Sequence, residues 1–342
     1  MGKLTTQVRK YYEHMDNECP HVSRYSRNLT LMHTLDKLDA CYHREDLIIQ
    51  IQKILLRKNK PNVLLTGAAG CGKTAIVEGL AAVIAERKIA YEEACLQAEK
   101  DYKAAMRKWE KQAEKGNANT PRPERVQPPK PFLCDCVLYD LSLTAMVGGT
   151  KYRGEFEERM QQLLDECKNK PNIILFIDEF HLVCTAGACE GCEGAAQMLK
   201  PALARSDIRV IGATTTEEKK MIAEDKALAR RFSEIDIQPL AGSAASETAQ
   251  KILADYCRFH QVSTEISATD LLEQVQYFLP HTVFPDNIIN VVDETLAGAV
   301  FDEVTVVDMS HFNAVLSRMT GKMILCTDIP GEPQFETTCT VA

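Results

Sequence analysis

A glycine-rich loop that begins at residue 67 carries the strongest chemical signal in the sequence. The run Gly67-Ala68-Ala69-Gly70-Cys71-Gly72-Lys73-Thr74 fits the pattern G-x-x-x-x-G-K-[ST], follows an apolar run and opens a helical pattern. Glycines in such a loop let the backbone amides curl around phosphates, and the helix N-terminus adds a favourable dipole. Lys73 would reach the β- and γ-phosphates, and Thr74 would ligate Mg²⁺. The loop predicts a nucleotide-binding site.

Two adjacent carboxylates follow a second apolar run. The run Ile173–Ile177 is typical of a buried strand, and Asp178 and Glu179 come directly after it. Ligands bind at the carboxyl edge of parallel sheets, where these two acids would lie. Asp178 would hold Mg²⁺, and Glu179 would polarise the attacking water. Together with the phosphate loop, the acids predict magnesium-dependent hydrolysis of ATP.

Two further segments could complete such a site. Thr215 ends another strand pattern at the same edge, where it could sense the γ-phosphate or merely cap the strand. Arg230 and Arg231 close a helical pattern ahead of the strand Ile235–Ile237. Adjacent arginines serve as solvated charges or phosphate neutralisers, and the sharper alternative is that they reach the γ-phosphate of a neighbouring subunit.

The elements that must position these residues alternate between strands and helices. We expect strands at Val63–Thr66, Val137–Leu141, Ile173–Ile177, Arg209–Gly212 and Ile235–Ile237. Strands alternating with helices imply a parallel sheet covered on both faces. After Pro239 the pattern is helical without strands, and the last helix has Asp308 as its cap and Gly321 as its stop. The expected fold is α/β, a P-loop NTPase sheet between helices, followed by a small all-helical lid.

These elements suggest four parts. We expect an irregular or weakly helical lead-in at 1–28, an α/β nucleotide-binding domain at 29–240, a lid at 241–322 and a flexible tail at 323–342. A charged insertion at 90–131 interrupts the second part. In it, apolar residues recur at alternating spacings of four and three, as in a coiled-coil seam, at Tyr91, Cys95, Ala98, Tyr102, Ala105 and Trp109. Residues 121–131 then hold five prolines, which predicts a stiff extended stretch. The insertion is either a docking arm or a helix packed on its own module.

Composition sets broad limits. The chain has 342 residues, of which 45% are hydrophobic and 26% charged, as in an ordinary globular protein. A net charge of −8 argues against nonspecific coating of nucleic acid but leaves a local basic patch open. No run reaches the length of a membrane span, and the N-terminus has no apolar signal core. We therefore expect no membrane partner and a cytoplasmic protein, whose 13 cysteines are reduced thiols.

Several long runs resemble the Clp family of AAA+ unfoldases, and specifically the first of that family's two ATPase modules. The runs are Lys73–Ala81, Gly149–Arg159 and Met198–Arg205. The resemblance covers about residues 29–322 apart from the insertion. It implies the AAA+ fold, ATP and Mg²⁺ as cofactors, and a hexameric ring. It also implies that loop motions driven by ATP pull a polypeptide through the central pore.

The resemblance also implies roles for individual residues. Besides the phosphate-loop and acidic residues, Thr215 matches the first sensor, and Arg230 and Arg231 match paired arginine fingers that act across a subunit boundary. Lys151 and Tyr152 match the pore loop, whose aromatic residue grips the threaded polypeptide. A rigid aromatic suits this task because it offers contact area at a low cost in rotamer entropy.

The sequence matches the family in the segment beside adenine but departs from it at single positions and in its additional domains. Cys41 and Tyr42 match the segment that passes beside adenine. Asn287 stands where the family usually has Lys, and Ala229 where it usually has Glu. Neither the family's N-terminal repeat domain nor its coiled-coil middle domain has a counterpart, so we expect a stand-alone first module. No tripeptide for docking a Clp peptidase occurs, so that partnership is not supported.

A cluster of soft ligands lies near the second acid. His181 and Cys184 precede Cys189-x-x-Cys192, a spacing that suits zinc or a redox pair. The alternative is ordinary thiols in a pore loop, beside a His181 that matches an ordinary family position. We favour the alternative.

The leading functional prediction is an ATP hydrolase that remodels or unfolds proteins by threading them past Tyr152. One alternative is an ATP-switched assembly regulator, linked to DNA or to a mobile element, that recruits protein partners without threading. Another is a modulatory subunit of a full-length Clp protein. Stimulation of ATP turnover by unfolded protein, by DNA or only by a protein partner would separate the three.

Overall fold

The computed structural model describes residues 3–114, 121–148, 153–185, 195–205 and 207–324. The chain divides into two compact units. The first comprises Met1–Thr66 and Thr74–Ile235, and the second comprises Gly67–Lys73 and Asp236–Ala342. No helix within the described ranges is long and apolar enough to cross a membrane.

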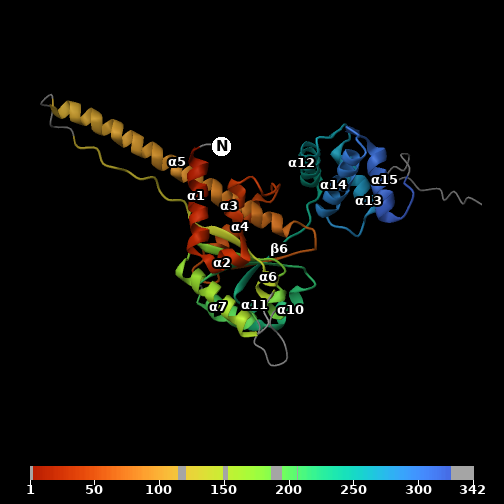
Figure 1. Cartoon of the computed structure of the whole chain (residues 1–342), viewed down its shortest axis with the longest axis horizontal. Helices are drawn as coiled ribbons and strands as arrows, with labels where there is room; N and C mark the ends of the chain where they lie inside the picture. Colours follow the sequence, from red (N-terminus) through yellow and green to blue (C-terminus); the bar gives the residue numbers. More distant parts are fainter. Residues whose placement is uncertain (1–2, 115–120, 149–152, 186–194, 206, 325–342) are drawn as a thin grey trace, which may run out of the picture. The chain divides into compact units, whose positions relative to one another are not determined.

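A six-stranded sheet with the order β1-β3-β4-β5-β2-β6 forms the centre of the first unit (Figure 1). Its strands are β1 (Ser26–Asn28), β2 (Asn62–Thr66), β3 (Val137–Leu141), β4 (Ile173–Ile177), β5 (Arg209–Thr214) and β6 (Phe232–Asp236). The pairs β3–β4, β4–β5 and β5–β2 are parallel, so these strands end at one edge. Every residue of β2 and β4 is buried, as expected for strands covered on both faces. The predicted α/β fold with a parallel sheet is confirmed.

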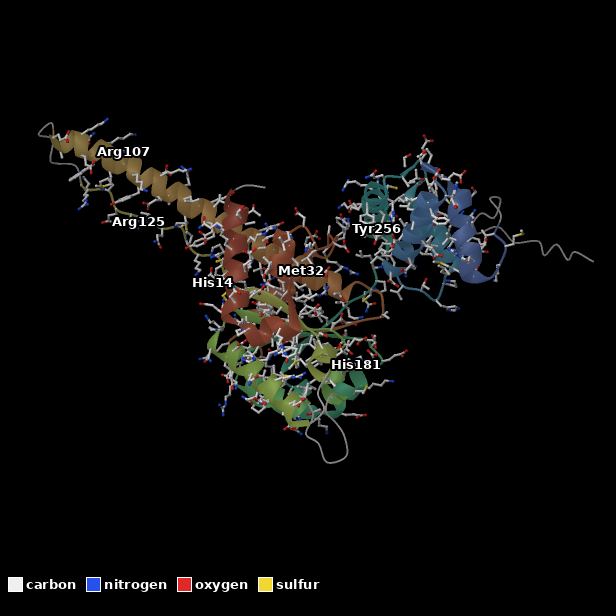
Figure 2. The ribbon with its side chains drawn as sticks, in the orientation of Figure 1. His14, Met32, Arg107, Arg125, His181 and Tyr256 are labelled. Carbon is white, nitrogen blue, oxygen red and sulfur yellow. The ribbon has the colours of Figure 1, made fainter. Side chains whose placement is uncertain are left out.

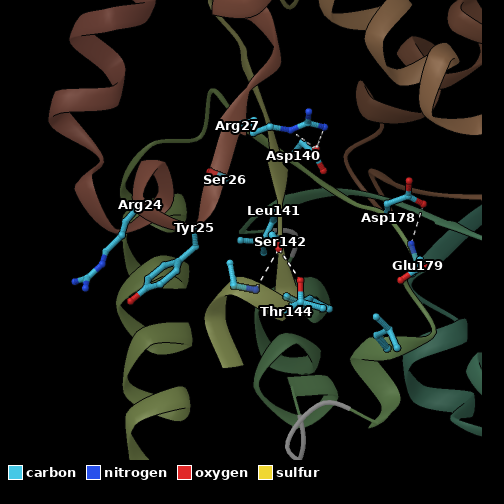
Figure 3. A pocket seen from close by; sticks show the side chains of 13 residues that line it. Arg24, Tyr25, Ser26, Arg27, Asp140, Leu141, Ser142, Thr144, Asp178 and Glu179 are labelled. Atoms are coloured by element: carbon cyan, nitrogen blue, oxygen red, sulfur yellow. Dashed lines mark hydrogen bonds and ion pairs between the residues drawn. The ribbon is translucent and has the colours of Figure 1, made fainter. Parts of the chain in front are cut away.

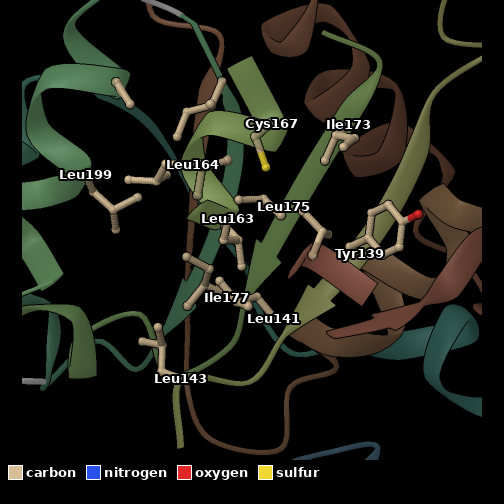
Figure 4. Close-up of a cluster of buried hydrophobic side chains, with 14 of the residues drawn as sticks. Tyr139, Leu141, Leu143, Leu163, Leu164, Cys167, Ile173, Leu175, Ile177 and Leu199 are labelled. Carbon is tan, nitrogen blue, oxygen red and sulfur yellow. The ribbon is translucent and has the colours of Figure 1, made fainter. Parts of the chain in front are cut away.

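Helices cover this sheet and pack their apolar faces against it. They are α1 (Lys3–Glu18), α2 (Pro20–Tyr25), α3 (Leu29–Thr34), α4 (Glu45–Leu55), α5 (Lys73–Glu114), α6 (Leu143–Val147), α7 (Arg153–Asn169), α8 (Leu182–Thr185), α9 (Ala195–Ala204), α10 (Lys219–Glu224) and α11 (Lys226–Ala229). Figure 4 shows part of the core, where Leu163 of α7 and Leu199 of α9 belong to the same buried cluster as Leu175 of β4. This packing fixes the strand ends that carry the polar residues of the site.

The N-terminal segment is ordered secondary structure, so the expectation of an irregular or weakly helical lead-in at 1–28 was wrong. Helices α1 and α2 lead into β1, which pairs antiparallel with β3 at the sheet edge. The carboxylate of Glu166 accepts the backbone N–H groups of His21 at 3.0 Å and Val22 at 2.9 Å, which satisfies the start of α2. The apolar face of this segment joins the core of the unit through Val8, Tyr12, Met15, Cys19 and Val22.

The insertion is an extension of the helix that follows the phosphate loop. Helix α5 is 42 residues long in all, runs past the start of the insertion at residue 90 and projects from the sheet (Figure 1). Residues 121–131 return beside it in extended form. All six predicted seam positions are half-buried. The side chain of Arg125 pairs with Glu99 at 2.8 Å, and the guanidinium of Arg87 lies 4.6 Å from the ring centre of Phe132. The helix therefore contacts the chain's own proline-rich segment, and we call this hairpin (residues 90–131) the arm.

The second unit is mainly helical. It contains α12 (Gly242–His260), α13 (Ala268–Phe278), α14 (Asp286–Phe301) and α15 (Met309–Thr320). The expectation that it lacks strands was wrong, because β7 (Ser263–Thr264) and β8 (Val306–Val307) form a short parallel pair.

The end of the described chain matches the predicted helix boundaries closely. Asp308 accepts the backbone N–H of Ser310 at 3.0 Å, and Gly321 has φ of 70°, so the predicted cap and stop of α15 are confirmed. Ile324, within the expected tail, is buried in the core of this unit and donates its N–H to Ser317 Oγ at 2.9 Å. The folded part therefore extends past the expected limit at residue 322.

Candidate active site

The phosphate loop has a backbone that only glycine adopts readily at two positions. Gly70 has φ of 75° and Gly72 has φ of 90°, both in the left-handed region. A Cβ on Gly70 would also lie 2.7 Å from the Cβ of Asp286, which belongs to the same unit. Side chains at these positions would force the loop open. The glycines of the motif are therefore required by the local geometry.

The lysine of the motif folds back over this loop. The Nζ of Lys73 donates to the carbonyl oxygens of Gly67 at 3.0 Å and Ala68 at 2.8 Å. Cys71 is fully buried and anchors the turn, with its N–H directed at the carbonyl of Ala68 at 3.4 Å. Ala69 is exposed at the rim. The ammonium group is thus held at the mouth of a curled loop, where it can meet an anion without a large movement.

The loop helix and the acidic strand end meet directly. Thr74 Oγ1 donates to Asp178 Oδ2 at 2.8 Å, and the N–H of Glu179 donates to Asp178 Oδ1 at 2.8 Å. Both acids are exposed, and Glu179 has a positive φ of 48°. A hydroxyl and a carboxylate supply only oxygen atoms, the donor type that Mg²⁺ prefers. The residues present therefore fit the cofactor that the sequence predicts.

The next strand end carries the expected sensor. Thr215 is half-buried after β5, and its Oγ1 donates to Glu218 Oε2 at 2.8 Å. Glu218 also faces His181, whose Nδ1 lies 3.1 Å from the same Oε2. The hydrogen bond from Thr215 lowers the pKa of Glu218 below its usual value. Our sequence analysis did not single out Glu218, although Thr215-x-x-Glu218 fits the capping-box pattern and could have indicated it.

The two arginines lie after α11. Arg230 is exposed and Arg231 is half-buried, and the carbonyl of Arg231 accepts Asn62 Nδ2 at 3.3 Å. Within the part of the chain that the structure describes, neither guanidinium takes part in an ion pair. Both charges therefore remain available to a group from outside this chain.

The expected adenine contacts lie against the root of α5. A Cβ added to Gly79 would lie 2.8 Å from the Cβ of Cys41, so Cys41 packs closely on the helix. Burial raises the pKa of the Cys41 thiol to about 11, which keeps it neutral at physiological pH. Tyr42 is half-buried beside it.

Other predicted residues fall outside the described ranges. These are the pore-loop residues Lys151 and Tyr152 and the thiols Cys189 and Cys192. Among the residues that are described, no three or more histidine, cysteine, aspartate or glutamate side chains are grouped so that they could hold a metal ion. His181 instead faces Glu218, as noted above, and the proposed soft-ligand cluster gains no support.

A cavity of about 600 Å³ opens beside the two acids (Figure 3). Across it, Arg27 of β1 donates to Asp140 Oδ2 at 2.6 Å. Ser142 caps α6 by accepting the N–H of Ala145 at 3.2 Å, and α6 leads toward residues 149–152. The cavity thus lies between the acids and the start of α6. Sequence reasoning missed Arg27 and Asp140, because no strand was expected at 26–28.

The similarity of this chain to known proteins agrees with this geometry. Residues 63–240, just over half of the chain, match the ATPase family associated with various cellular activities (AAA). The chain is 35% identical over 299 residues to the chaperone protein ClpB of Aquifex aeolicus (strain VF5), which covers 87% of this chain and 25% of that protein. It is 34% identical over 281 residues to the chloroplastic chaperone protein ClpC of Pisum sativum, covering 82% of this chain and 26% of that protein.

A solved structure shows the same likeness in three dimensions. The closed-state reconstruction of Hsp104 with ATPγS and FITC casein superimposes with a TM-score of 0.68 at 29% identity, covering 88% of this chain and 45% of that one. The resemblance to Clp-type proteins is confirmed. The chain spans about a quarter of the length of the curated relatives named above.

Proposed function

The chain belongs to the AAA family of ATPases, and from that premise we propose that it binds ATP with Mg²⁺ and hydrolyses it where Thr74 meets Asp178. One observation carries the proposal: Thr74 Oγ1 lies 2.8 Å from Asp178 Oδ2. A nucleotide site needs the loop helix and the acidic strand end within reach of the same ion, and this contact supports that requirement.

Each residue of the site has a task in this proposal. The loop amides and Lys73 hold the phosphates, while Cys41 and Tyr42 flank the base. Mg²⁺, held by Thr74 and Asp178, would neutralise charge on the phosphates. Glu179 orients the attacking water by accepting its hydrogen bond, and its exposed carboxylate at the sheet edge is suited to that task.

The arginines extend the proposal to an assembly. Arg230 and Arg231 would contact the γ-phosphate bound by a neighbouring copy, so the active form would be a ring, as the family resemblance implies a hexamer. Their charges have no ion-pair partner in the described part of the chain, which supports this role. Arg231→Ala should keep nucleotide binding and lose at least about tenfold in turnover. Loss of binding itself would indicate that Arg231 acts within its own chain.

The proposed work of the ring is to pull polypeptide with Lys151 and Tyr152. Two findings support this role. The cavity beside the acids reaches the helix that precedes these residues. The similar Hsp104 reconstruction contains casein. Because the cavity lies between the acids and α6, hydrolysis at the acids and pulling by the residues after α6 would influence each other.

A second candidate function rests on the arm. A hairpin that projects from the sheet is a natural docking point for a protein partner, so the chain could regulate an assembly, alone or with a full-length Clp protein, without threading. In that case a protein partner or DNA, and not unfolded polypeptide, would stimulate ATP turnover.

The deciding experiment measures phosphate release from ATP with and without casein, in the parent protein and in the Tyr152→Ala variant. Stimulation that the variant loses would support threading. Stimulation kept by the variant, or none at all, would overturn it and favour the second candidate. Glu179→Gln serves as the control for the chemistry, because it should bind ATP and lose turnover. Turnover unchanged in Glu179→Gln would remove Glu179 from the proposed mechanism.

A further inference from the structure

One carboxylate oxygen connects the two strand ends of the site. Glu218 Oε2 accepts the hydroxyl of Thr215 at 2.8 Å and the N–H of Thr215 at 3.3 Å. The same oxygen lies 3.1 Å from Nδ1 of His181, which Figure 2 labels on the loop after β4. A single side chain from the start of α10 therefore holds groups that follow both β5 and β4.

His181 lies on the same loop after β4 as the acids Asp178 and Glu179. Only Phe180 separates His181 from Glu179. The N–H of Phe180 donates to the carbonyl of Ala213 at 2.7 Å, which fastens one side of the loop to β5. The contact between His181 and Glu218 fastens the other side. Because Glu179 has a positive φ, its carboxylate direction depends on how its neighbours are held.

We propose that Glu218 is a positioning residue for ATP hydrolysis, which links Thr215 to the loop of Glu179 through His181. The inference rests on the proposed function of Glu179 and Thr215. In the structure the hydroxyl proton of Thr215 is directed at Glu218. A phosphate oxygen that accepts the hydrogen bond of this hydroxyl instead would leave Glu218 Oε2 to His181 and to the N–H of Thr215. Contact at the sensor would thereby reach the water-orienting acid two residues before His181.

A simpler role for Glu218 would be to close the turn from Thr215 that leads into α10. The N–H of Glu218 donates to Thr215 Oγ1 at 3.2 Å, so the two residues form a reciprocal capping arrangement. Glutamine serves that arrangement as well as glutamate does. The contact with His181 lies outside that arrangement. The neighbouring Lys219 is engaged by Glu234, which leaves the charge of Glu218 directed at His181.

The substitution Glu218→Gln separates these roles. Capping alone predicts turnover equal to that of Glu217→Gln, an exposed neighbour that serves as the matched control. Positioning predicts a kcat about tenfold lower with KM for ATP unchanged. His181→Gln should cause a similar loss, and the double variant should be no slower than either single one, because both act through one contact. Losses that multiply in the double variant would overturn the proposal.

Hydrogen–deuterium exchange tests the same contact without relying on activity. In the nucleotide-free chain, Glu218→Gln should speed exchange in peptides from 178–184, whereas Glu217→Gln should not. Faster exchange confined to 216–224 would reduce Glu218 to a cap and overturn the proposal. A parent protein that fails to hydrolyse ATP would instead count against the proposed function, and the exchange data would still decide whether Glu218 holds the acidic loop.

Discussion

The two halves of α5 lie in different surroundings although no break separates them. All of the buried residues of the helix fall between Ile76 and Lys88, under the sheet. Beyond Lys88 the side chains are half-buried or exposed, and those of the seam lie along the proline-rich return segment. One half carries the phosphate loop at its start, and the other half forms the arm.

This difference shows how one helix can be stabilised in two ways. The first half gains from complete removal of apolar side chains from water. The arm relies instead on residues with high helix propensity, on partial burial against a stiff chain and on surface ion pairs. The arm should therefore tolerate substitution much better than the first half. Four measurements can break or sharpen this contrast.

The largest expected effect comes from matched leucines in the two halves. Leu80 is fully buried, whereas Leu96 is 45% exposed. Leu80→Ala should lower the free energy of unfolding by about 2–5 kcal/mol, because it leaves a cavity in the core. Leu96→Ala should lower it by less than about 1 kcal/mol. Urea denaturation gives both values, and equal losses would show that the arm is as tightly packed as the sheet.

Lys88, the last buried residue of α5, should have an intermediate effect on the free energy of unfolding. The Nζ of Lys88 lies 2.7 Å from Asp135 Oδ1 and 3.1 Å from Glu92 Oε1, and it sits over the ring of Tyr11. Lys88→Met should lower the free energy of unfolding by about 1–3 kcal/mol, since two half-buried carboxylates lose a charged donor. The control is Lys103→Met on the arm, an exposed lysine that pairs with Glu99, which should cost less than about 0.5 kcal/mol. A free energy unchanged by Lys88→Met would mean that α1 and α5 are joined without this cluster.

The same cluster should respond to pH. Burial alone would raise the pKa of Asp135, but hydrogen bonds from Lys130 and Lys88 outweigh it and hold the pKa below its ordinary value. A lowered pKa in the folded state gives stability that is present above the unfolded pKa of about 3.9 and is lost as the pH falls through the folded value. The deficit of Lys88→Met relative to the parent should therefore shrink below about pH 4. Denaturation curves between pH 3 and 6 measure it, and a constant deficit would exclude Asp135 as the partner that matters.

The smallest effect is expected at the exposed pair of the arm. Arg125→Ala removes the contact with Glu99 and should change the free energy of unfolding by less than about 1 kcal/mol. ATP turnover without a partner protein should stay unchanged, because the arm lies outside the proposed site. Reduced turnover would show that a change on the arm alters the proposed ATP site at the other end of α5.

Sequence patterns predicted well the elements whose signal is local. Strands β2 to β5 and the cap and stop of α15 follow from short apolar runs and from Asp308 and Gly321. The last strand was expected at Ile235–Ile237 but lies at Phe232–Asp236, because polar residues interrupt its apolar pattern. The meeting of Thr74 and Asp178 could also be anticipated, because parallel strands end at one edge. Such features need no knowledge of distant contacts.

What the sequence analysis missed depends on contacts between distant segments or on amphipathic side chains. Val8, Tyr12, Met15 and Cys19 recur at spacings of four and three, but tyrosine and cysteine weaken the apolar pattern of α1. The pair of Arg27 and Asp140 requires an edge strand that this segment forms. The link between Glu218 and His181 joins residues 37 positions apart, which no local pattern reveals.

The unbroken course of α5 also provides a built-in reporter. Trp109 is the only tryptophan of the chain, and it lies on the arm seam, 36 residues after Lys73. At 1.5 Å per residue, the indole stands about 54 Å along the helix axis from the phosphate loop. A tilt of about 5° at the root would move it by about 5 Å, so a small rotation at the nucleotide end becomes a large displacement at the indole. Intrinsic fluorescence can follow the arm without any added dye, since excitation at the red edge of the aromatic absorption selects the single indole over the ten tyrosines.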